Sequence, residues 1–246
     1  MKICRFQSGQ FVSLGVIEGD HVVAFENDRR KDQEFSLSDV NLLPPVAPSK
    51  IVCVGRNYSE HAAELGNEVP SEPLLFLKAP SAIINTEAAI RLPAQSQQVE
   101  HEGELAVVIG RRCRSIADGD DAMRYVLGFT CLNDVTARDL QKKDGQFTRA
   151  KSFDTFCPVG PLIETELQLD QISLTTRVNG DVRQFARLWQ MVFPVDFLIR
   201  YISNMMTLMP GDVIATGTPS GVGKLERGDV CEVEIDGIGI LRNPVE

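Results

Sequence analysis

The chain has 246 residues, of which 43% are hydrophobic and 24% are charged, and its formal net charge is −9 at pH 7. This length and composition predict a soluble globular protein with one substantial core and room for a small appendage. The negative charge and the lack of a long basic cluster argue against nucleic acid or an anionic membrane as a partner. No segment reaches the roughly 18 consecutive apolar residues that a membrane span needs.

Residues 1–47 predict a small N-terminal β domain. Apolar runs separated by glycine-containing turns are typical of short antiparallel strands, and they occur at 2–7, 11–17 and 21–25. The polar stretch 27–34 and the proline-rich stretch 42–48 then interrupt the pattern, as a linker does. We therefore place a domain boundary at residue 47, with a second domain over residues 48–246.

The sequence pattern of residues 48–246 predicts mostly strands. Strand-like segments lie at 50–55, 74–78, 213–215, 230–235 and 239–241. Helical composition or spacing occurs at 59–65, 117–125 and 193–206. Glycine-containing turns separate the C-terminal strands, so the pattern predicts a mainly β fold with a few helices, in the α+β class.

The N-terminal residues and the spacing of the cysteines predict the cellular location of the protein. Polar side chains interrupt residues 1–8 too early for a signal peptide. The 6 cysteines are widely scattered and lack the close pairing of zinc or redox motifs. We expect a cytoplasmic protein with free, buried thiols.

The segment 99–110 places two carboxylates before an apolar run with strand character. Side chains two apart on a strand share a face, so Glu102 and Glu104 are expected close together. Such a pair needs a shared proton or a bound cation, and a third carboxylate, Asp134, follows another apolar stretch. Three carboxylates favour a hard cation, Mg²⁺ or Mn²⁺. The alternative is that both glutamates face solvent on an exposed sheet.

His61 and Glu64 lie three residues apart in a predicted helix, within reach of each other on one side. Glu64 could orient the imidazole, so that His61 acts as a general base. The alternative is an incidental pair on a surface helix.

Two further segments carry functional residue types. Lys151 is flanked by small and aromatic residues and could polarise a developing oxyanion, although most lysines are solvent-exposed. The stretch 216–223 offers backbone amides and Thr218 to an anion. Its spacing is not that of a phosphate-binding loop, and a tight turn is the alternative.

These motifs, taken together and in order, resemble the fumarylacetoacetate hydrolase (FAH) family from about residue 50 to the C-terminus. The matching segments are Gly55-Arg56-Asn57-Tyr58 with His61 and Glu64, Glu102-Gly103-Glu104-Leu105-Ala106, Asp134-Val135-Thr136-Ala137-Arg138-Asp139, Lys151-Ser152-Phe153-Asp154, and Thr216-Gly217-Thr218-Pro219-Ser220-Gly221-Val222-Gly223. The resemblance implies a mixed β-sandwich roll as the catalytic domain, a Mg²⁺ or Mn²⁺ ion and a homodimer.

The resemblance also implies roles for single residues. Glu102, Glu104 and Asp134 match the family's metal ligands, His61 and Glu64 its base dyad, Lys151 its catalytic lysine, and Gln141 and Thr218 its contacts to the substrate's carboxylate and oxo groups. Arg138 we interpret as structural, in an ion pair with Asp139 or another acid.

The implied substrate is a small 2-oxo acid. We expect first a metal-dependent hydrolase that cleaves a C–C bond in acylpyruvates such as fumarylpyruvate. The alternative is a lyase or isomerase at the same site: an oxaloacetate decarboxylase, a 2-hydroxyhepta-2,4-diene-1,7-dioate isomerase or a 5-oxopent-3-ene-1,2,5-tricarboxylate decarboxylase. A protein that only binds a metal or metabolite is disfavoured, because every matched position carries a competent residue type.

Substrate-selecting residues are expected in 66–73 and 185–193, where no motif identifies them. Trp189 and Met191 lie in the second of these segments and are expected in the core, as is usual for such apolar residues.

Overall fold

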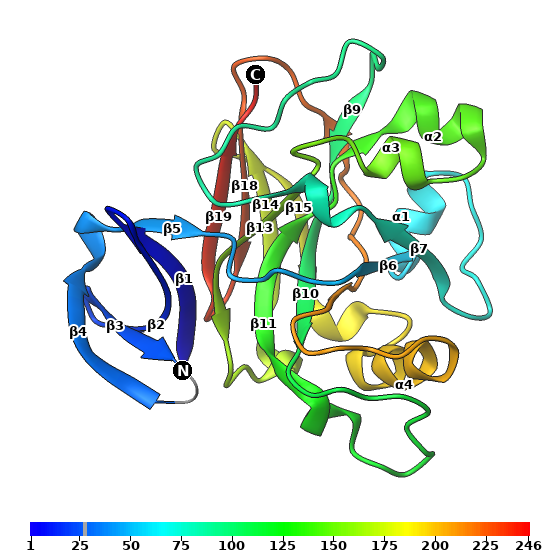
Figure 1. The fold of residues 1–246 in the computed structure, drawn as a ribbon. Helices are drawn as coiled ribbons and strands as arrows, with labels where there is room; N and C mark the ends of the chain where they lie inside the picture. Colours follow the sequence, from blue (N-terminus) through cyan, green and yellow to red (C-terminus); the bar gives the residue numbers. More distant parts are fainter. Residues whose placement is uncertain (27–28) are drawn as a thin grey trace.

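The computed structural model describes residues 1–26 and 29–246 of the chain. Strands dominate this part, with a few short helices, which confirms the predicted mainly β fold (Figure 1). The described strands form sheets of 12, 4 and 3 strands. No helix in the described part is long and apolar enough to cross a membrane.

The large sheet runs through the whole molecule in the order β4-β3-β2-β1-β13-β11-β10-β16-β6-β7, with β5 paired to β1 and β8 paired to β13. Its strands are β1 (Lys2–Ser8), β2 (Phe11–Glu18), β3 (His21–Glu26), β4 (Arg29–Ser36), β5 (Asn41–Leu43), β6 (Ile51–Gly55), β7 (Leu74–Lys78), β8 (Ile83–Ile84), β10 (Gly103–Ile109), β11 (Val126–Asn133), β13 (Cys157–Glu164) and β16 (Val213–Ala215). The strands β1–β5 form a group to one side of the remainder (Figure 1).

The remaining strands form two smaller sheets. The four-stranded sheet has the order β15-β14-β18-β19, and the three-stranded sheet β12-β9-β17. Their strands are β9 (Val99–His101), β12 (Thr136–Ala137), β14 (Ser173–Val178), β15 (Asp181–Arg187), β17 (Gly223–Lys224), β18 (Val230–Ile235) and β19 (Gly239–Pro244). The helices are α1 (Ser59–Glu64), α2 (Arg138–Asp144), α3 (Thr148–Lys151) and α4 (Val195–Met205), with 3₁₀ turns η1 (Leu37–Asp39), η2 (Pro80–Ala82), η3 (Ala122–Tyr125), η4 (Leu169–Gln171) and η5 (Leu188–Gln190).

Gly103 marks where the large sheet packs on the four-stranded sheet. A Cβ atom at Gly103 would lie 2.0 Å from the Thr176 Oγ1 atom of β14 and 3.3 Å from Val233 of β18. Neighbouring residues of a strand face opposite sides, so Glu102 and Glu104 point away from this contact. A glycine therefore allows close packing behind the two carboxylates.

One apolar cluster joins the N-terminal strands to the rest of the chain. Phe6 of β1 is buried in the same cluster as Leu105 and Val107 of β10. Helix α4 packs on it through Leu198 and Ile202, which are spaced by about one turn. The six cysteines are free and buried, as predicted.

The predicted elements differ from the structure at a few places. The helix predicted at 117–125 is wrong: only the 3₁₀ turn η3 forms, because Gly119 adopts a φ of +90° and the side chain of Asp121 accepts a hydrogen bond from the Met123 backbone. Helices α2 and α3 were not predicted, since their sequences are mostly polar and show no apolar period. Of the polar stretch 27–34, residues 29–34 belong to β4, and residues 27–28 lie outside the described part.

Candidate active site

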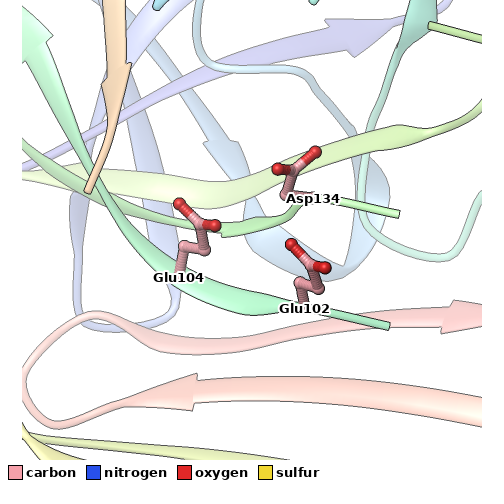
Figure 2. Close-up of side chains that lie close together, drawn as sticks. All are labelled: Glu102, Glu104 and Asp134. Atoms are coloured by element: carbon pink, nitrogen blue, oxygen red, sulfur yellow. The ribbon is translucent and has the colours of Figure 1, made fainter. Parts of the chain in front are cut away.

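The pairing of β10 with β11 brings three carboxylates together. Glu102 directly precedes β10, Glu104 lies within it, and Asp134 directly follows β11. Gly103 pairs with Asn133, and the Asp134 amide donates to the Glu102 carbonyl at 2.8 Å. One carboxylate oxygen from each residue lies within 4.8 Å of the others, and the three groups point toward one another (Figure 2). All three residues are buried, so the solvent-facing alternative is wrong.

Three cationic side chains compensate the negative charges of Glu102 and Asp134. The Lys151 Nζ atom donates to Glu102 at 2.7 Å and to Asp134 at 2.6 Å. Lys78 donates to the other oxygen of Asp134 at 2.6 Å, and Arg138 donates to Glu102. Lys78 and Lys151 are both buried, so Lys151 is not a surface lysine.

These contacts shift the pKa values of the buried groups in opposite directions. Burial alone raises the pKa of Glu102, but Lys151 and Arg138 outweigh it and hold that pKa below its ordinary value. Burial also acts against the charge of Lys151, yet Asp134 and Glu102 keep the pKa of Lys151 above its ordinary value. Glu102 is therefore a carboxylate and Lys151 an ammonium group at neutral pH.

Among the described residues, no cationic side chain forms a hydrogen bond or ion pair with Glu104. Burial, Asp134 and Glu102 raise the pKa of Glu104 well above its ordinary value. Its Oε2 atom accepts a hydrogen bond of 2.8 Å from the Gly217 amide, a group that carries no formal charge. A carboxyl in this state takes a proton or a cation, so the donor set fits a divalent cation with oxygen ligands.

His61 and Glu64 lie on helix α1 beside this cluster. The His61 Nδ1 atom is 3.4 Å from the Glu64 Oε2 atom, and His61 is buried. The Glu64 carboxylate also accepts hydrogen bonds from the Gly221 amide at 3.0 and 3.2 Å. Glu64 is exposed and is held against the glycine-rich segment 216–223, so a buried histidine and an exposed glutamate form the pair, and its role as a base dyad stays a prediction.

Backbone amides of the glycine-rich segment 216–223 form hydrogen bonds with carboxylates of the protein itself. Its amides at Gly217 and Gly221 donate to Glu104 and Glu64. Gly217 has a φ of +101°, and a Cβ atom there would lie 2.7 Å from Asn57 Cβ. Glycine is needed at this position to bring the amide to Glu104.

One pocket of about 470 Å³ unites most of the predicted site residues. Seven of them line it: His61, Glu102, Glu104, Asp134, Gln141, Lys151 and Thr218. Glu64 does not line it and contacts it only through His61. Asn67 lines it from the segment 66–73, whereas nothing from 185–193 does.

The structural role expected of Arg138 stays a prediction: its ion pairs are with acids other than Asp139, and Arg138 also lines the pocket. Arg138 donates to Glu100 at 2.8 Å, to Glu102, and to the Gln141 Oε1 atom at 2.6 Å. Asp139 instead accepts hydrogen bonds from Ser96 and the Gln97 amide. The expectation for Trp189 was wrong, because 65% of it is exposed, whereas Met191 is buried as expected.

Sequence reasoning missed three residues of this region. Lys78 is the last residue of an otherwise apolar strand and pairs with Asp134. A charged residue at the end of an apolar strand is a signal of a buried ion pair that could have been used. Arg56 lines the pocket with a φ of +59°, a conformation that concentrates at functional sites. Gln184, on β15, hydrogen-bonds to Thr218 at 2.7 Å, and nothing local in its sequence indicated this contact.

The comparisons with known proteins identify the family. The fumarylacetoacetate (FAA) hydrolase C-terminal family matches residues 50–246, and a family described as Rv2993c-like, N-terminal, matches residues 1–45. The chain belongs to the FAH family. The resemblance read from the motifs is thereby confirmed.

The relatives of this chain within the FAH family are named after different reactions. The oxaloacetate tautomerase fahd2 of Xenopus laevis is 44% identical, and the match covers 86% of this chain and 70% of that protein. The structure of 5-carboxymethyl-2-hydroxymuconate delta-isomerase from Mycobacterium smegmatis has a TM-score of 0.93 at 45% identity, covering 100% of this chain and 98% of that one. Maleylpyruvate hydrolase from Sphingobium sp. SYK-6, solved with manganese (II) ion and pyruvate, has a TM-score of 0.83 at 32% identity, with coverage of 100% and 98%.

Proposed function

We propose that this FAH-family protein is an enzyme that interconverts the keto and enol forms of a small 2-oxo acid, with oxaloacetate as substrate. The observation that carries the proposal is the placing of His61, Lys151 and the three carboxylates around one pocket. A base, a buried cation and a candidate metal site are the parts that enolisation next to a carbonyl requires. The 44% identical relative named as an oxaloacetate tautomerase supports the choice of substrate.

Glu102, Glu104 and Asp134 would hold Mg²⁺ or Mn²⁺. When bound, the cation supplies positive charge beside the oxo and carboxylate oxygens of the substrate. Glu104, whose pKa burial and the neighbouring carboxylates raise, would bind the cation as a carboxylate and would release its proton.

The protein's own groups account for the proton transfer. His61, oriented by Glu64, removes a proton from C3 of the keto acid, and the electron pair of that C–H bond forms the C2–C3 double bond. Negative charge then develops on the C2 oxygen, where the buried ammonium of Lys151 stabilises it. Solvent water gives a proton to this oxygen and takes the proton that His61 holds, which completes the enol and restores the base, and the reverse sequence regenerates the keto acid.

Arg56 supports a substrate with two carboxylates. It lines the same pocket, and its side chain forms no hydrogen bond or ion pair with any described residue. A guanidinium group pairs well with a carboxylate in a bidentate arrangement. Oxaloacetate offers a second carboxylate at the end opposite its 2-oxo acid group, and we assign that carboxylate to Arg56.

The proposal is tested by following the enol absorbance of oxaloacetate with Mg²⁺ and with Mn²⁺. We expect tautomerisation that chelation abolishes, and a loss of about 10²- to 10⁴-fold in kcat for His61→Ala, the usual contribution of a general base. His21→Ala is the matched control, because His21 lies far along the sheet on β3. Full activity in His61→Ala with normal metal binding would show that His61 is not the base.

Hydrolysis of acylpyruvates is the second candidate, and the fixed His61–Glu64 pair favours it because the same base could activate water. A panel of fumarylpyruvate, acetylpyruvate, oxaloacetate and the 2-hydroxyheptadienedioate, each compared by kcat/KM, separates hydrolase, tautomerase, decarboxylase and isomerase. Stoichiometric metal binding without turnover of any of these compounds would point to a binding protein.

A homodimer is also part of the proposal. β15 is an edge strand, Phe185 on it is 59% exposed, and Trp189, four residues later in the chain, is also exposed. Large apolar side chains on an edge strand favour association with a second copy. We expect a dimer in sedimentation experiments, and Phe185→Glu with Trp189→Glu should shift it to monomer, whereas Val12→Glu on β2 should not.

A further inference from the structure

Arg56 lines the pocket in a backbone conformation that favours glycine. Its φ of +59° lies in the left-handed region, where the Cβ atom of any other residue crowds the backbone. The Arg56 side chain forms no hydrogen bond or ion pair with any described residue. The described fold therefore gains no polar contact from an arginine at a position where glycine would be unstrained.

Asn57, the next residue, is held by hydrogen bonds to two other segments of the chain. Its Nδ2 atom donates to the Thr216 carbonyl at 2.7 Å and to the Phe193 carbonyl at 3.1 Å. Its Oδ1 atom accepts from the Phe193 amide at 2.7 Å, and its own carbonyl accepts from the Val192 amide at 2.8 Å. Asn57 is 0% exposed, so both its side chain and its backbone are fixed.

The residue on the other side of Arg56 is fixed as well. Gly55 is the last residue of β6 and pairs with Leu74 of β7. Arg56 therefore connects one residue held by the sheet to one residue held by Asn57's hydrogen bonds, and its φ and ψ follow from that connection. A strained residue persists only where its surroundings determine its conformation in this way, and such residues concentrate at functional sites.

We propose that Asn57 is a positioning residue that forces Arg56 into the left-handed conformation at the pocket wall, so that the guanidinium group meets the second carboxylate of the substrate. This rests on the proposed function, which assigns that carboxylate to Arg56. The strained turn destabilises the free protein, and the substrate contact is the reason that an arginine occupies it. Asn57 thereby sets the selectivity for acids with two carboxylates over acids with one.

Thermal unfolding tests the strain without any ligand. Glycine adopts the left-handed conformation freely, so Arg56→Gly should raise Tm by about 2–4 °C. In the Asn57→Ala background the same substitution should give a clearly smaller rise, because Asn57 no longer forces the conformation. Ser115→Gly is the matched control: Ser115 also has a positive φ, of +50°, and lies outside the pocket. It should raise Tm and leave ligand binding unchanged.

Binding to the Mn²⁺-saturated protein tests the selectivity without turnover. Malate and lactate share a 2-hydroxy acid group, but only malate carries a second carboxylate. We expect the wild type to bind malate about tenfold more tightly than lactate, the order of one charge-assisted hydrogen bond. Arg56→Met and Asn57→Ala should each lose this preference with lactate binding unchanged. The double variant should lose no more than either single variant, because both substitutions remove one contact.

Asn243→Ala is the matched control for Asn57→Ala. Asn243 is also buried, its Nδ2 atom donates to the carbonyls of Asn85 and Ala88, and it lies outside the pocket. Its loss should lower Tm and keep the preference for malate. Should Asn57→Ala fail to fold, Asn57→Asp, which keeps the acceptor for the Phe193 amide, takes its place with the same expectations.

Three results would each overturn the proposal. A Tm that Arg56→Gly leaves unchanged or lowers would mean that the turn is not strained. A preference for malate that survives in Asn57→Ala would mean that Arg56 does not depend on Asn57. Equal weakening of malate and lactate in Asn57→Ala would mean that Asn57 is only structural. A wild type that prefers malate but does not tautomerise oxaloacetate would disprove the proposed function and leave this inference supported.

Discussion

Asp134 is held by two buried lysines, one on each side of its carboxylate. Lys78 contacts Oδ1 and Lys151 contacts Oδ2, each at 2.6 Å. Only Lys151 also reaches Glu102 and lines the pocket. Both lysines therefore compensate the buried charge of Asp134, but only Lys151 is placed at the pocket, where the proposed function assigns it to the substrate.

Lys151→Met should separate catalysis from metal binding. The methionine keeps most of the side-chain volume but removes the positive charge beside the reacting oxygen. We expect kcat to fall by about 10²- to 10³-fold, as for loss of one electrostatic stabiliser, while Mn²⁺ still binds because its three carboxylates remain. Kinetics with Mn²⁺ titration check this, with exposed Lys142→Met as control. Unchanged kcat would exclude the electrostatic role.

At the scale of single elements, the close packing of β10 on β14 depends on Gly103. In Gly103→Ala, the new Cβ would lie 2.0 Å from Thr176 Oγ1 and 3.3 Å from Val233, so the Thr176 side chain or the packing of the two sheets must shift. We expect a loss of about 1–3 kcal/mol in the free energy of unfolding, the usual cost of overpacking, measured by urea denaturation. Thr176→Ala should restore part of it in the double variant, and strict additivity of the two substitutions would contradict this explanation.

Asp212 joins the turn before β16 to the segment before β6. Buried Asp212 accepts hydrogen bonds from Ser49 Oγ at 2.6 Å and from the Met209 amide at 2.8 Å, and pairs with Lys50. Burial opposes its charge, but Lys50 and Ser49 outweigh it and hold the pKa of Asp212 below its usual 3.8. The folded protein therefore stabilises the ionised form of Asp212 more than the unfolded chain does.

This shift gives Asp212 a defined pH dependence. A lowered folded pKa stabilises the fold above the unfolded pKa of about 3.8 and loses this effect as the pH falls through the folded pKa. Asp212→Asn should lower the free energy of unfolding by about 2–4 kcal/mol at pH 7, and the difference from wild type should shrink below pH 3.8. Urea titrations across this range check it. A constant difference would contradict the assignment.

For the whole molecule, the predicted boundary at residue 47 does not interrupt the large sheet. β1 pairs with β13 through Lys2 with Glu164 and Ile3 with Ile163, and Phe6 is in the same apolar cluster as Leu105. A shared sheet and core couple the two parts energetically.

We therefore expect one cooperative unfolding transition in scanning calorimetry of the metal-free protein. Saturating Mn²⁺ should raise its midpoint, because a ligand that binds only the folded state stabilises it. Two resolved transitions, with only one moved by Mn²⁺, would show that the N-terminal strands and the remainder unfold independently.

Local rules explain what could be read from the residues alone. The alternation of a strand places Glu102 and Glu104 on one face, and the spacing of a helix brings His61 near Glu64. The helical period at 193–206 likewise corresponds to α4. The short polar helices α2 and α3 could not be found this way, because tertiary contacts and not an apolar period stabilise them.

The sequence by itself thus determined the mainly β class, the family and the residue types of the site, because these follow from short-range periodicity and ordered motifs. Only the tertiary structure decided that Lys78 compensates the charge of Asp134, 56 positions away, and that Gln184 on β15 hydrogen-bonds to Thr218, 34 positions away. Such contacts depend on which strands pair and which sheets pack, and no local pattern specifies this.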